Sequence, residues 1–317
     1  MELGYWLSCE EHPPTALVDH AVSAEEAGFR LALASDHQHP WVPAQGQAPF
    51  VWAALGAIAH ATSELTIGTG VSSPIHRLHP AVLAQAASTV AAMAPGRFVL
   101  GLGLGERLND HITGAPWPRP GVRRRMLCES ISVIRRLLTG EDVDHEGEFF
   151  TVEHTQLFTR PATPPPIWVA IAGPRTARVA AELADGMIGL QPNAAHVEAF
   201  ETAGGVGKPV VAQLHVCLAD TTDDAIATVR AWWPQQGLPP ALLSELSRPT
   251  QFAAATALVT DEQLRHAVVC CDDPRPIIDA VAAFAGVGYS HVLLHQVGPD
   301  QERLFDLAQR ELLPATR

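Results

Sequence analysis

Short apolar runs alternate with amphipathic segments along the whole chain. The runs have the length of strands, and their continuous apolar character is typical of strands buried in a parallel sheet. We predict eight strands, at residues 3–8, 30–35, 65–71, 98–103, 167–172, 187–190, 210–218 and 291–296. The intervening segments predict helices at residues 15–27, 49–61, 80–94, 123–138, 176–184, 223–233 and 276–284.

Three glycines lie at joints between a predicted helix and the next predicted strand. Gly28, Gly186 and Gly288 each occupy a place where a left-handed C-terminal cap favours a residue without a Cβ atom. Eight strands that alternate with helices favour a (β/α)8 barrel over an open, doubly wound sheet. The sequence therefore predicts an α/β fold, a TIM barrel.

Two stretches interrupt the alternation. Residues 140–166 place Glu146-Gly147-Glu148 between two β-prone pieces and end in a proline-rich run, which predicts a hairpin or an excursion. Residues 234–265 form a long, proline-interrupted insertion after the seventh strand. We expect residues 1–317 to form one barrel domain, with long insertions shaping its substrate side.

Composition and charge narrow the class of protein. The chain has 317 residues, of which 47% are apolar and 17% are charged, so the composition allows a sizeable core. The net charge of −13 disfavours nucleic acid and anionic membranes as partners. No signal-peptide pattern and no membrane-length apolar run is present, so we expect a cytoplasmic protein. Five scattered cysteines predict reduced thiols rather than a metal or redox site.

Chemically reactive side chains gather where the predicted strands end. The second strand ends in Asp36-His37, the third in residues 70–74, the fourth in residues 101–106 and the fifth in Ala172-Gly173. In a parallel barrel these ends share one face, where barrel enzymes hold their active sites. A buried strand has no reason to end in a carboxylate and an imidazole unless they meet solvent or a ligand. We therefore predict an active site at this face.

Each of these residues also has a purely structural interpretation. Asp36 could cap the turn after its strand, Glu106 could be an acid in the first turn of a helix, and Trp41 could be an aromatic at the core edge. His37 and His39 have the spacing of metal ligands, but no matching set of carboxylates and histidines accompanies them. We therefore expect no metal site.

These motifs together make the chain similar to a known family. It resembles the bacterial-luciferase-like flavin and deazaflavin oxidoreductases, and most of all the branch of coenzyme F420-dependent glucose-6-phosphate dehydrogenases. The resemblance runs nearly end to end and preserves the order of the motifs. The matching residues are Leu3-Gly4-Tyr5, Glu10, Ser35-Asp36-His37, Pro40-Trp41, Ala48-Pro49-Phe50, Gly68-Thr69, Pro80-Ala81-Val82, Gly101-x-Gly103-x-Gly105-Glu106-x-Leu108-Asn109, Ala172-Gly173-Pro174, Ala184-Asp185-Gly186 and Asp300-Gln301-x-Arg303.

The resemblance implies a role for most residues at the predicted strand ends. His37 and Glu106 would be the catalytic acid/base candidates beside the carbon that exchanges hydride with coenzyme F420. Gly70-Val71 falls where the family has a non-prolyl cis peptide bond, and backbone N–H groups at Ala172-Gly173 would hold the cofactor's phosphate. The implied cofactor-binding set is Asp36, Gly70, Val71, Ser73, Gly105, Glu106, Asn109, Ala172 and Gly173.

The substrate side departs from the resembling branch. Those enzymes hold a sugar phosphate with cationic side chains, whereas this chain has Asn193 and Ala267 at the matching places. We therefore predict poor use of glucose 6-phosphate. Leu190, Trp232 and Trp233 favour a more apolar alcohol or carbonyl compound, or a related C=N or C=C compound, although Trp232 and Trp233 could equally belong to the core of a helix. The implied substrate-facing residues are Trp41, Glu10, Leu190 and Asn193.

Two other functions remain open on the sequence. One is an FMN-dependent luciferase-like monooxygenase with a partner reductase. The other is a cofactor-binding protein without catalysis, against which the presence of His37 and Glu106 counts. For Arg123-Arg124-Arg125 we expect a solvated helix start rather than a partner for an anionic cofactor tail. The resemblance also implies a homodimer that acts on a small molecule.

Overall fold

The computed structural model describes residues 1–315, and its central feature is a closed barrel of eight parallel strands. The strands are β1 (Glu2–Leu7), β2 (Leu31–Ala34), β3 (Thr66–Thr69), β4 (Phe98–Leu102), β7 (Ile167–Ala170), β8 (Gly186–Gly189), β9 (Val210–Leu218) and β11 (His291–Gln296). Their order is β11-β1-β2-β3-β4-β7-β8-β9, and β9 pairs with both β8 and β11, which closes the barrel. The predicted TIM barrel and its eight strands are confirmed.

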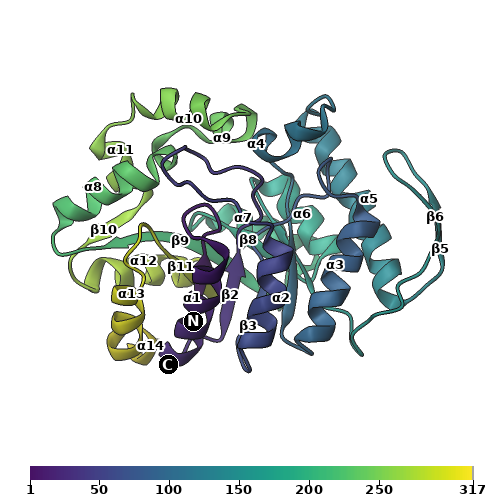
Figure 1. The fold of residues 1–317 in the computed structure, drawn as a ribbon, viewed down its shortest axis with the longest axis horizontal. Helices are drawn as coiled ribbons and strands as arrows, with labels where there is room; N and C mark the ends of the chain where they lie inside the picture. The colour runs from purple at the N-terminus through teal and green to yellow at the C-terminus, as the bar shows by residue number, and fades with distance from the viewer. Residues whose placement is uncertain (316–317) are drawn as a thin grey trace.

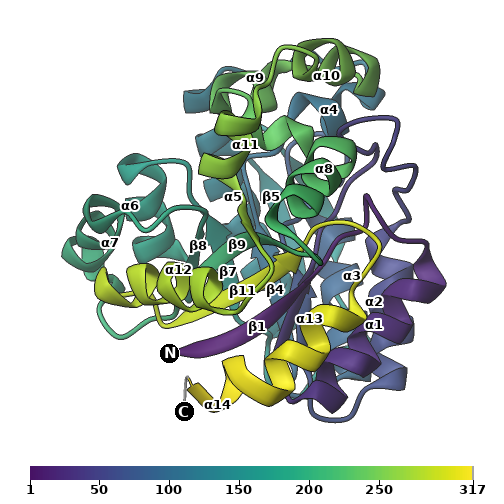
Figure 2. The same cartoon turned by 90° about the vertical axis from the view of Figure 1, so that its left-hand side faces the viewer.

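The amphipathic segments between the strands form helices that cover the outside of the barrel (Figure 2). These helices are α1 (Pro14–Ala27), α2 (Val51–Ala61), α3 (Pro80–Met93), α5 (Pro120–Thr139), α6 (Pro174–Leu183), α7 (Ala194–Phe200), α12 (Arg275–Gly286) and α13 (Glu302–Leu307). Neighbours in the series α13, α1, α2, α3, α5, α6 and α7 pack on each other. A proline in the first turn starts α1, α3, α5 and α6, where its missing N–H costs no hydrogen bond.

The segment after β9 builds a cover over one end of the barrel. It continues through α8 (Thr222–Trp232), η3 (Pro234–Gly237), α9 (Pro240–Glu245), α10 (Pro249–Thr256) and α11 (Asp261–Ala267). α9 and α10 lie near α4 (Arg107–Asp110), at the end opposite the start of β1 and α14 (Leu313–Ala315) (Figures 1 and 2). The carboxyl ends of the strands therefore face this cover.

Three strands lie outside the barrel. β10 (Val269–Cys271), which the sequence did not predict, pairs with the carboxyl half of β9. β5 (Val143–Glu146) and β6 (Thr151–Thr155) form an antiparallel hairpin at the periphery, as one of the two predictions for this stretch had it (Figure 1). The remaining short helical turns are η1 (His111–Thr113), η2 (Glu201–Gly205) and η4 (Ala308–Leu312).

The barrel interior changes from apolar to polar along its axis. Its apolar part consists of Trp6, Leu31, Leu33, Val99, Trp168, Ile188, Val211 and Leu293. Side chains two residues apart on a strand share a face, so Gln213, His215 and His295 continue the inner faces of β9 and β11 towards their carboxyl ends. All three are buried. A polar layer therefore separates the apolar interior from the covered end.

A second apolar cluster anchors the cover. Phe252 of α10 is fully buried and packs edge-on against Trp41, with 5.2 Å between the ring centroids. Trp233 and Leu264 belong to the same cluster. Trp41 therefore joins the loop after β2 to the segment after β9.

The glycines at the helix–strand joints follow the prediction at two of three positions. Gly28 and Gly288 have φ angles of 107° and 96°, in the left-handed region. The prediction for Gly186 was wrong, because this residue lies inside β8 and has no positive φ. A Cβ atom there would come within 2.7 Å of the Trp168 ring and 2.9 Å of the Pro209 carbonyl oxygen. Close packing, and not a cap, requires this glycine.

Within residues 1–315, no helix is both long and apolar enough to cross a membrane. The five cysteines are free thiols.

Gly101 provides a test of the barrel packing. A Cβ atom there would overlap the carbonyl oxygen of Thr69 and lie 3.0 Å from Val71. We predict that Gly101→Ala lowers the free energy of unfolding by about 1–3 kcal/mol or more, measured by urea denaturation. Gly56→Ala on α2 is the control, because its Cβ meets nothing closer than 3.9 Å, and a gain of about 0.5–1 kcal/mol is expected there. Equal losses in both variants would contradict the packing.

Candidate active site

A cavity of about 570 Å³ opens at the carboxyl ends of the barrel strands, beneath the cover. Residues from the ends of β1 to β4, β7 and β8 line it together with the polar layer of β9 and the segment after α8. Among the residues predicted for the site, it is lined by Glu10, Asp36, His37, Trp41, Gly70, Val71, Ser73, Gly105, Glu106, Asn109, Ala172 and Leu190. The barrel therefore brings most of the predicted set to one place.

The imidazole of His37 lies between two carboxyl groups. Its Nε2 atom is 3.4 Å from Oε1 of Glu10 and 3.4 Å from Oε2 of Glu106. Its Nδ1 atom is 3.2 Å from the backbone oxygen of His39, and its ring lies 5.0 Å from that of Trp41. A proton on Nδ1 satisfies that carbonyl, so Nε2 is the nitrogen available for proton exchange.

Glu10 is held from behind by hydroxyl groups. Only 2% of this residue is exposed. Ser35 donates to its Oε2 atom at 2.5 Å, and Ser8 donates to the same atom at 3.2 Å. Ser35 also accepts the backbone N–H of Cys9 at 2.9 Å. These bonds leave Oε1 of Glu10 directed at His37.

Glu106 precedes the short helix α4 and is linked through Asn109 to the loop that carries His37. Asn109 donates to Oε2 of Glu106 at 2.9 Å, and its own oxygen accepts the backbone N–H of Gln38 at 2.9 Å. Burial raises the pKa of the Glu106 carboxyl above its usual value, although the neighbouring His37 opposes the shift. Repulsion from Glu10 raises that pKa further.

Asp36 is locked in a buried ion pair. Its Oδ1 atom lies 2.7 Å from Nη2 of Arg77, and its Oδ2 atom accepts a 2.5 Å hydrogen bond from Ser72. Arg77 also donates to the backbone oxygen of Asp36 at 3.1 Å. The carboxylate therefore ties the end of β2 to the loop after β3, which is more than the turn cap that the sequence left open.

The loop after β3 contains the one cis peptide bond of the described residues, Gly70-Val71, at the position that the family resemblance implied. Two residues on, Ser73 donates to Asp110 at 3.2 Å. Asp110 also accepts the backbone N–H groups of His76 and Arg77, both at 3.0 Å. Burial raises the pKa of the Asp110 carboxyl against these bonds. This network fixes the loop beside the cavity.

Arg123 corrects the sequence prediction of a solvated helix start. It is only 4% exposed, lines the cavity and stacks on the Trp117 ring at 4.3 Å. Its guanidinium donates to the carbonyl of Gly105 and to Ser244 of α9, both at 3.1 Å, and its Nε atom has no partner within residues 1–315. Burial lowers the pKa of this guanidinium. The amphipathic turn that starts α5 points this first arginine inwards, whereas Arg125 is exposed.

Two predicted residues do not line the cavity. Gly173 is the N-cap residue of α6, next to Ala172. Asn193 caps α7, where its side-chain oxygen accepts backbone N–H groups of the first helical turn, so it is engaged locally.

Sequence reasoning missed several lining residues. Gln213 and His215 of β9 and Gln236 of η3 face the cavity. The signal for the first two was the alternation of polar with apolar residues in a strand that otherwise reads as fully buried. Trp233 had two interpretations on the sequence, and it serves both, because it also packs in the apolar cluster of the cover.

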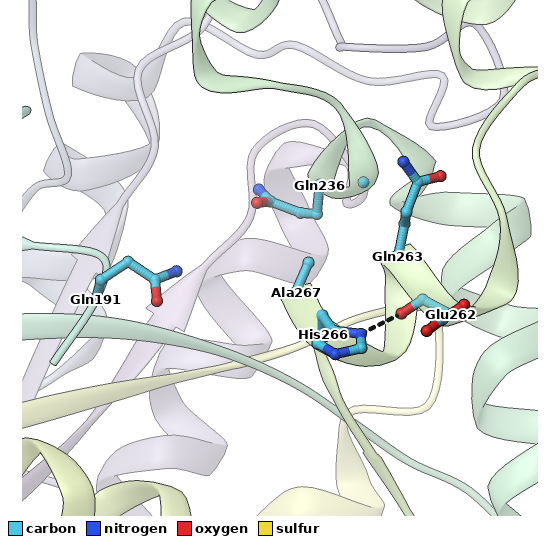
Figure 3. A pocket seen from close by; sticks show the side chains of 7 residues that line it. Gln191, Gln236, Glu262, Gln263, His266 and Ala267 are labelled. Carbon is cyan, nitrogen blue, oxygen red and sulfur yellow. Dashed lines mark hydrogen bonds between the residues drawn. The ribbon is translucent and has the colours of Figure 1, made fainter.

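A smaller cavity of about 420 Å³ adjoins the main one at Gln236, which lines both. Gln191 and Gln236 extend into it from opposite sides, and α11 supplies Gln263 and His266 (Figure 3). Five of its seven described lining residues have polar side chains, and none of the seven is a lysine or an arginine.

The spacing of His37 and His39 also made them candidate metal ligands on the sequence. Across residues 1–315, no group of three or more His, Cys, Asp or Glu side chains is arranged to hold a metal ion. The side chain of His37 instead contacts the backbone of His39.

Comparison with known sequences identifies the family. A model of the luciferase-like monooxygenases matches residues 1–291. The chain belongs to the luciferase-like family. The F420-dependent glucose-6-phosphate dehydrogenase of Intrasporangium calvum is 32% identical over 332 residues, which cover 100% of this chain and 99% of that protein. The protein of the same name from Rhodococcus erythropolis is 33% identical and is covered to 98%.

Two solved structures have the same fold. An F420-dependent secondary alcohol dehydrogenase, solved with an F420–acetone adduct, superimposes with a TM-score of 0.92 at 27% identity and covers 100% of this chain and 99% of its own. The coenzyme F420-dependent tetrahydromethanopterin reductase of Methanopyrus kandleri reaches a TM-score of 0.80 at 21% identity, covering 100% of both chains, and so shares the fold.

The raised pKa of Glu106 predicts how this luciferase-like protein responds to pH. Because the folded state disfavours the ionised carboxylate, Glu106→Gln should raise the Tm at neutral pH. The gain should shrink as the pH falls through the raised value towards the unfolded value of about 4.3, because the carboxyl is then neutral in both states.

Glu148→Gln is a control of opposite sign, because the hydrogen bond from Arg125 lowers the pKa of Glu148. The ionised Glu148 carboxylate therefore stabilises the folded state above its unfolded pKa, and this stabilisation is lost as the pH falls. This variant should therefore lower the Tm at neutral pH and lose that effect in acid. If the change in Tm with pH has the same sign and shape in Glu106→Gln as in Glu148→Gln, the folded state does not disfavour the charge of Glu106.

Proposed function

We propose that the protein is a coenzyme F420-dependent oxidoreductase that transfers a hydride between the deazaflavin and the carbon of an alcohol or carbonyl substrate. The observation that carries this proposal is the contact of His37 Nε2 with Glu10 and Glu106 at the wall of a largely apolar cavity. That constellation suits a proton exchange beside a redox ring. The names of the relatives described above point to the same cofactor.

The cavity has features that fit a flat ring with an anionic tail. Val71, Leu104 and Ile171 provide apolar lining beside it. A Cβ atom at Gly173 would meet nothing within 4 Å, so the backbone at the start of α6 is open to a ligand. The guanidinium of Arg123 lines the cavity and supplies a cationic donor there. Such a donor is suited to a phosphate or carboxylate.

In this proposal the ring lies along the ends of β2, β3, β4 and β7. When bound, it supplies a carbon that accepts a hydride from an alcohol or returns it to a carbonyl. The residues proposed to hold it are Asp36, Gly70, Val71, Ser73, Gly105, Glu106, Asn109, Ala172 and Gly173, with Arg123 towards the anionic tail. Asp36 acts through its lock on the loop after β3, because its carboxylate is already paired with Arg77.

In this proposal His37 is the proton acceptor. Oxidation of an alcohol releases a hydride from carbon and a proton from the hydroxyl group, and that proton needs an acceptor. Nε2 of His37 accepts it, and the carboxyl groups of Glu10 and Glu106 stabilise the resulting positive charge. The raised pKa of Glu106 lets this carboxyl share the proton. In the reverse direction the same groups deliver a proton to the carbonyl oxygen.

The charges around the cavity argue against a phosphorylated substrate. The carboxylates that line it are Glu10, Asp36, Glu106 and Glu245. Of its described lining residues, Arg123 alone is a lysine or arginine, and it lies 3.7 Å from Glu245. The one lysine of the chain, Lys208, donates to backbone carbonyls at the amino end of the barrel. A dianion would therefore meet mostly negative charge. We propose an uncharged alcohol or ketone, with Trp41 and Leu190 on the substrate side.

The two other functions that the sequence left open are possible outcomes of the cofactor titration described below. An FMN-dependent monooxygenase would use the same cavity with another ring, and a non-catalytic protein would bind a cofactor without turnover. The homodimer expected from the resemblance stays a prediction.

A cofactor titration tests the proposal. We predict that the apoprotein binds F420 saturably and binds FMN at least about tenfold more weakly. The holoprotein should reduce its cofactor with heptan-2-ol, and kcat/KM for glucose 6-phosphate should be at least about tenfold lower. Spectrophotometric titration and the loss of the oxidised-cofactor absorbance are the readouts.

Arg123→Gln and Arg125→Gln form a matched pair for the cofactor's tail. Loss of the buried donor should raise the Kd for F420 by about tenfold or more, whereas loss of its exposed neighbour should leave the Kd unchanged. Binding of FMN without F420 would favour the monooxygenase, and F420 binding without any turnover would favour the non-catalytic reading. Preferred oxidation of glucose 6-phosphate would overturn the substrate argument.

A further inference from the structure

The polar layer of the barrel lies away from His37 along the barrel wall. Gln213 and His215 lie on β9, and β11 and β1 separate that strand from β2, which delivers His37. Three strand spacings amount to about 14 Å along the barrel wall. These side chains therefore face the cavity from the side opposite the proposed cofactor.

A buried hydrogen bond between an imidazole and a carboxylate anchors this layer. Glu11 and His295 have fully buried side chains, and Oε2 of Glu11 lies 2.7 Å from Nε2 of His295. The other carboxylate oxygen accepts the backbone N–H of Gly298 at 2.8 Å. Because a carboxylate only accepts, the Nε2 atom of His295 carries a proton. This contact fixes the imidazole of His295 in orientation.

The amide of Gln213 connects this anchor to the cavity. Its nitrogen lies 3.2 Å from Nδ1 of His295 and 3.3 Å from Nε2 of His215. The amide nitrogen of Gln236 lies 3.3 Å from the same Nε2 atom of His215. Because amide nitrogens only donate, both of these ring nitrogens accept. Nε2 of His215 therefore carries no proton.

The remaining proton of His215 faces the cavity. Burial, with the nearby His295, lowers the pKa of His215 well below its usual value, so the ring is neutral and its proton is on Nδ1. Nδ1 makes no hydrogen bond within residues 1–315, and it is not among the polar atoms there that are sealed from solvent. His215 lines the cavity, so this N–H donor is open to a ligand.

We propose that Nδ1–H of His215 is a specificity-determining donor, which binds an uncharged oxygen of the substrate distant from the reacting carbon. An oriented N–H donor without a partner favours the binding of a ligand that accepts its hydrogen bond, because an unmade hydrogen bond at a buried site costs free energy. Glu11, His295 and Gln213 are positioning residues, because they act through His215. The inference rests on the proposed function, and it narrows the substrate class to alcohols or ketones with a second oxygen.

The surroundings of His215 favour an ether, hydroxyl or carbonyl oxygen over an anion. Trp233 packs 5.8 Å from the His215 ring, and Leu190 and Leu243 also line the cavity. No cationic side chain is within the polar layer as described, and a neutral imidazole offers an anion no net charge. One neutral hydrogen bond and an apolar wall suit an oxygen within a carbon chain.

An oxygen scan of one substrate tests the inference. The probes are heptan-2-ol and the three ethers in which oxygen replaces the methylene at position 4, 5 or 6. One ether should exceed heptan-2-ol in kcat/KM by about 3–10-fold in the wild type. The preference should be lost in His215→Phe. It should be kept in part in His215→Asn, whose amide nitrogen takes the place of Nδ1.

The outcomes separate this inference from the proposed function. Turnover of heptan-2-ol with no ether preferred at any position would overturn the inference and leave the function intact. An ether preference that survives in His215→Phe would also overturn it. If no alcohol is oxidised, the proposed function fails. The inference is then tested by the protonation state of the His215 ring.

Nuclear magnetic resonance of the ¹⁵N-histidine-labelled apoprotein reads that state without cofactor or turnover. The His215 signals are assigned by their absence in His215→Asn. Long-range proton–nitrogen spectra should show a protonated Nδ1 and an unprotonated Nε2 in His215, and a protonated Nε2 in His295. A His215 ring protonated at Nε2, or at both nitrogens at neutral pH, would contradict the inference.

Discussion

The imidazole of His37 between two carboxyl groups is the interaction on which the site depends. Three separate strand ends must converge to make it, because Glu10 follows β1, His37 follows β2 and Glu106 follows β4. The closed parallel barrel brings these three strand ends to one face. Burial raises the pKa of the Glu106 carboxyl, and repulsion between the two carboxyl groups around this imidazole adds to the shift.

The surrounding structure holds this arrangement with buried polar pairs rather than apolar contact alone. The ion pair of Asp36 and Arg77 ties the His37 loop to the loop after β3, and Asn109 ties it to Glu106. On the other side of the cavity, the pair of Glu11 and His295 orders the polar layer of the barrel. Buried pairs of this kind add little net stability, but they favour one geometry over its alternatives. In our proposals, one wall of the cavity exchanges the proton and the opposite wall recognises the substrate.

The sequence predicted the barrel because each strand is a short apolar run between helical segments. Most of the residues that it predicted for the site line the cavity, because they lie at or just after strand ends. The sequence did not predict features that depend on contacts between residues far apart in the chain. β10 has only three residues, too few for a pattern. Arg123 belongs to a run of three arginines that is typical of a solvated helix start, but the geometry of α5 directs its side chain inwards. His215 lay inside a buried strand, and the tautomer that gives it a role depends on partners far along the chain.

The most direct test of the account is the rate of hydride transfer when His37 loses its proton-accepting nitrogen. Rapid mixing of F420-loaded wild type and His37→Phe with saturating heptan-2-ol would isolate the first reduction of the cofactor. A positioned acid/base contributes about 10²–10⁴-fold, so the account predicts a fall of that size with an F420 Kd unchanged within a few-fold. Reduction at the wild-type rate in His37→Phe would contradict it.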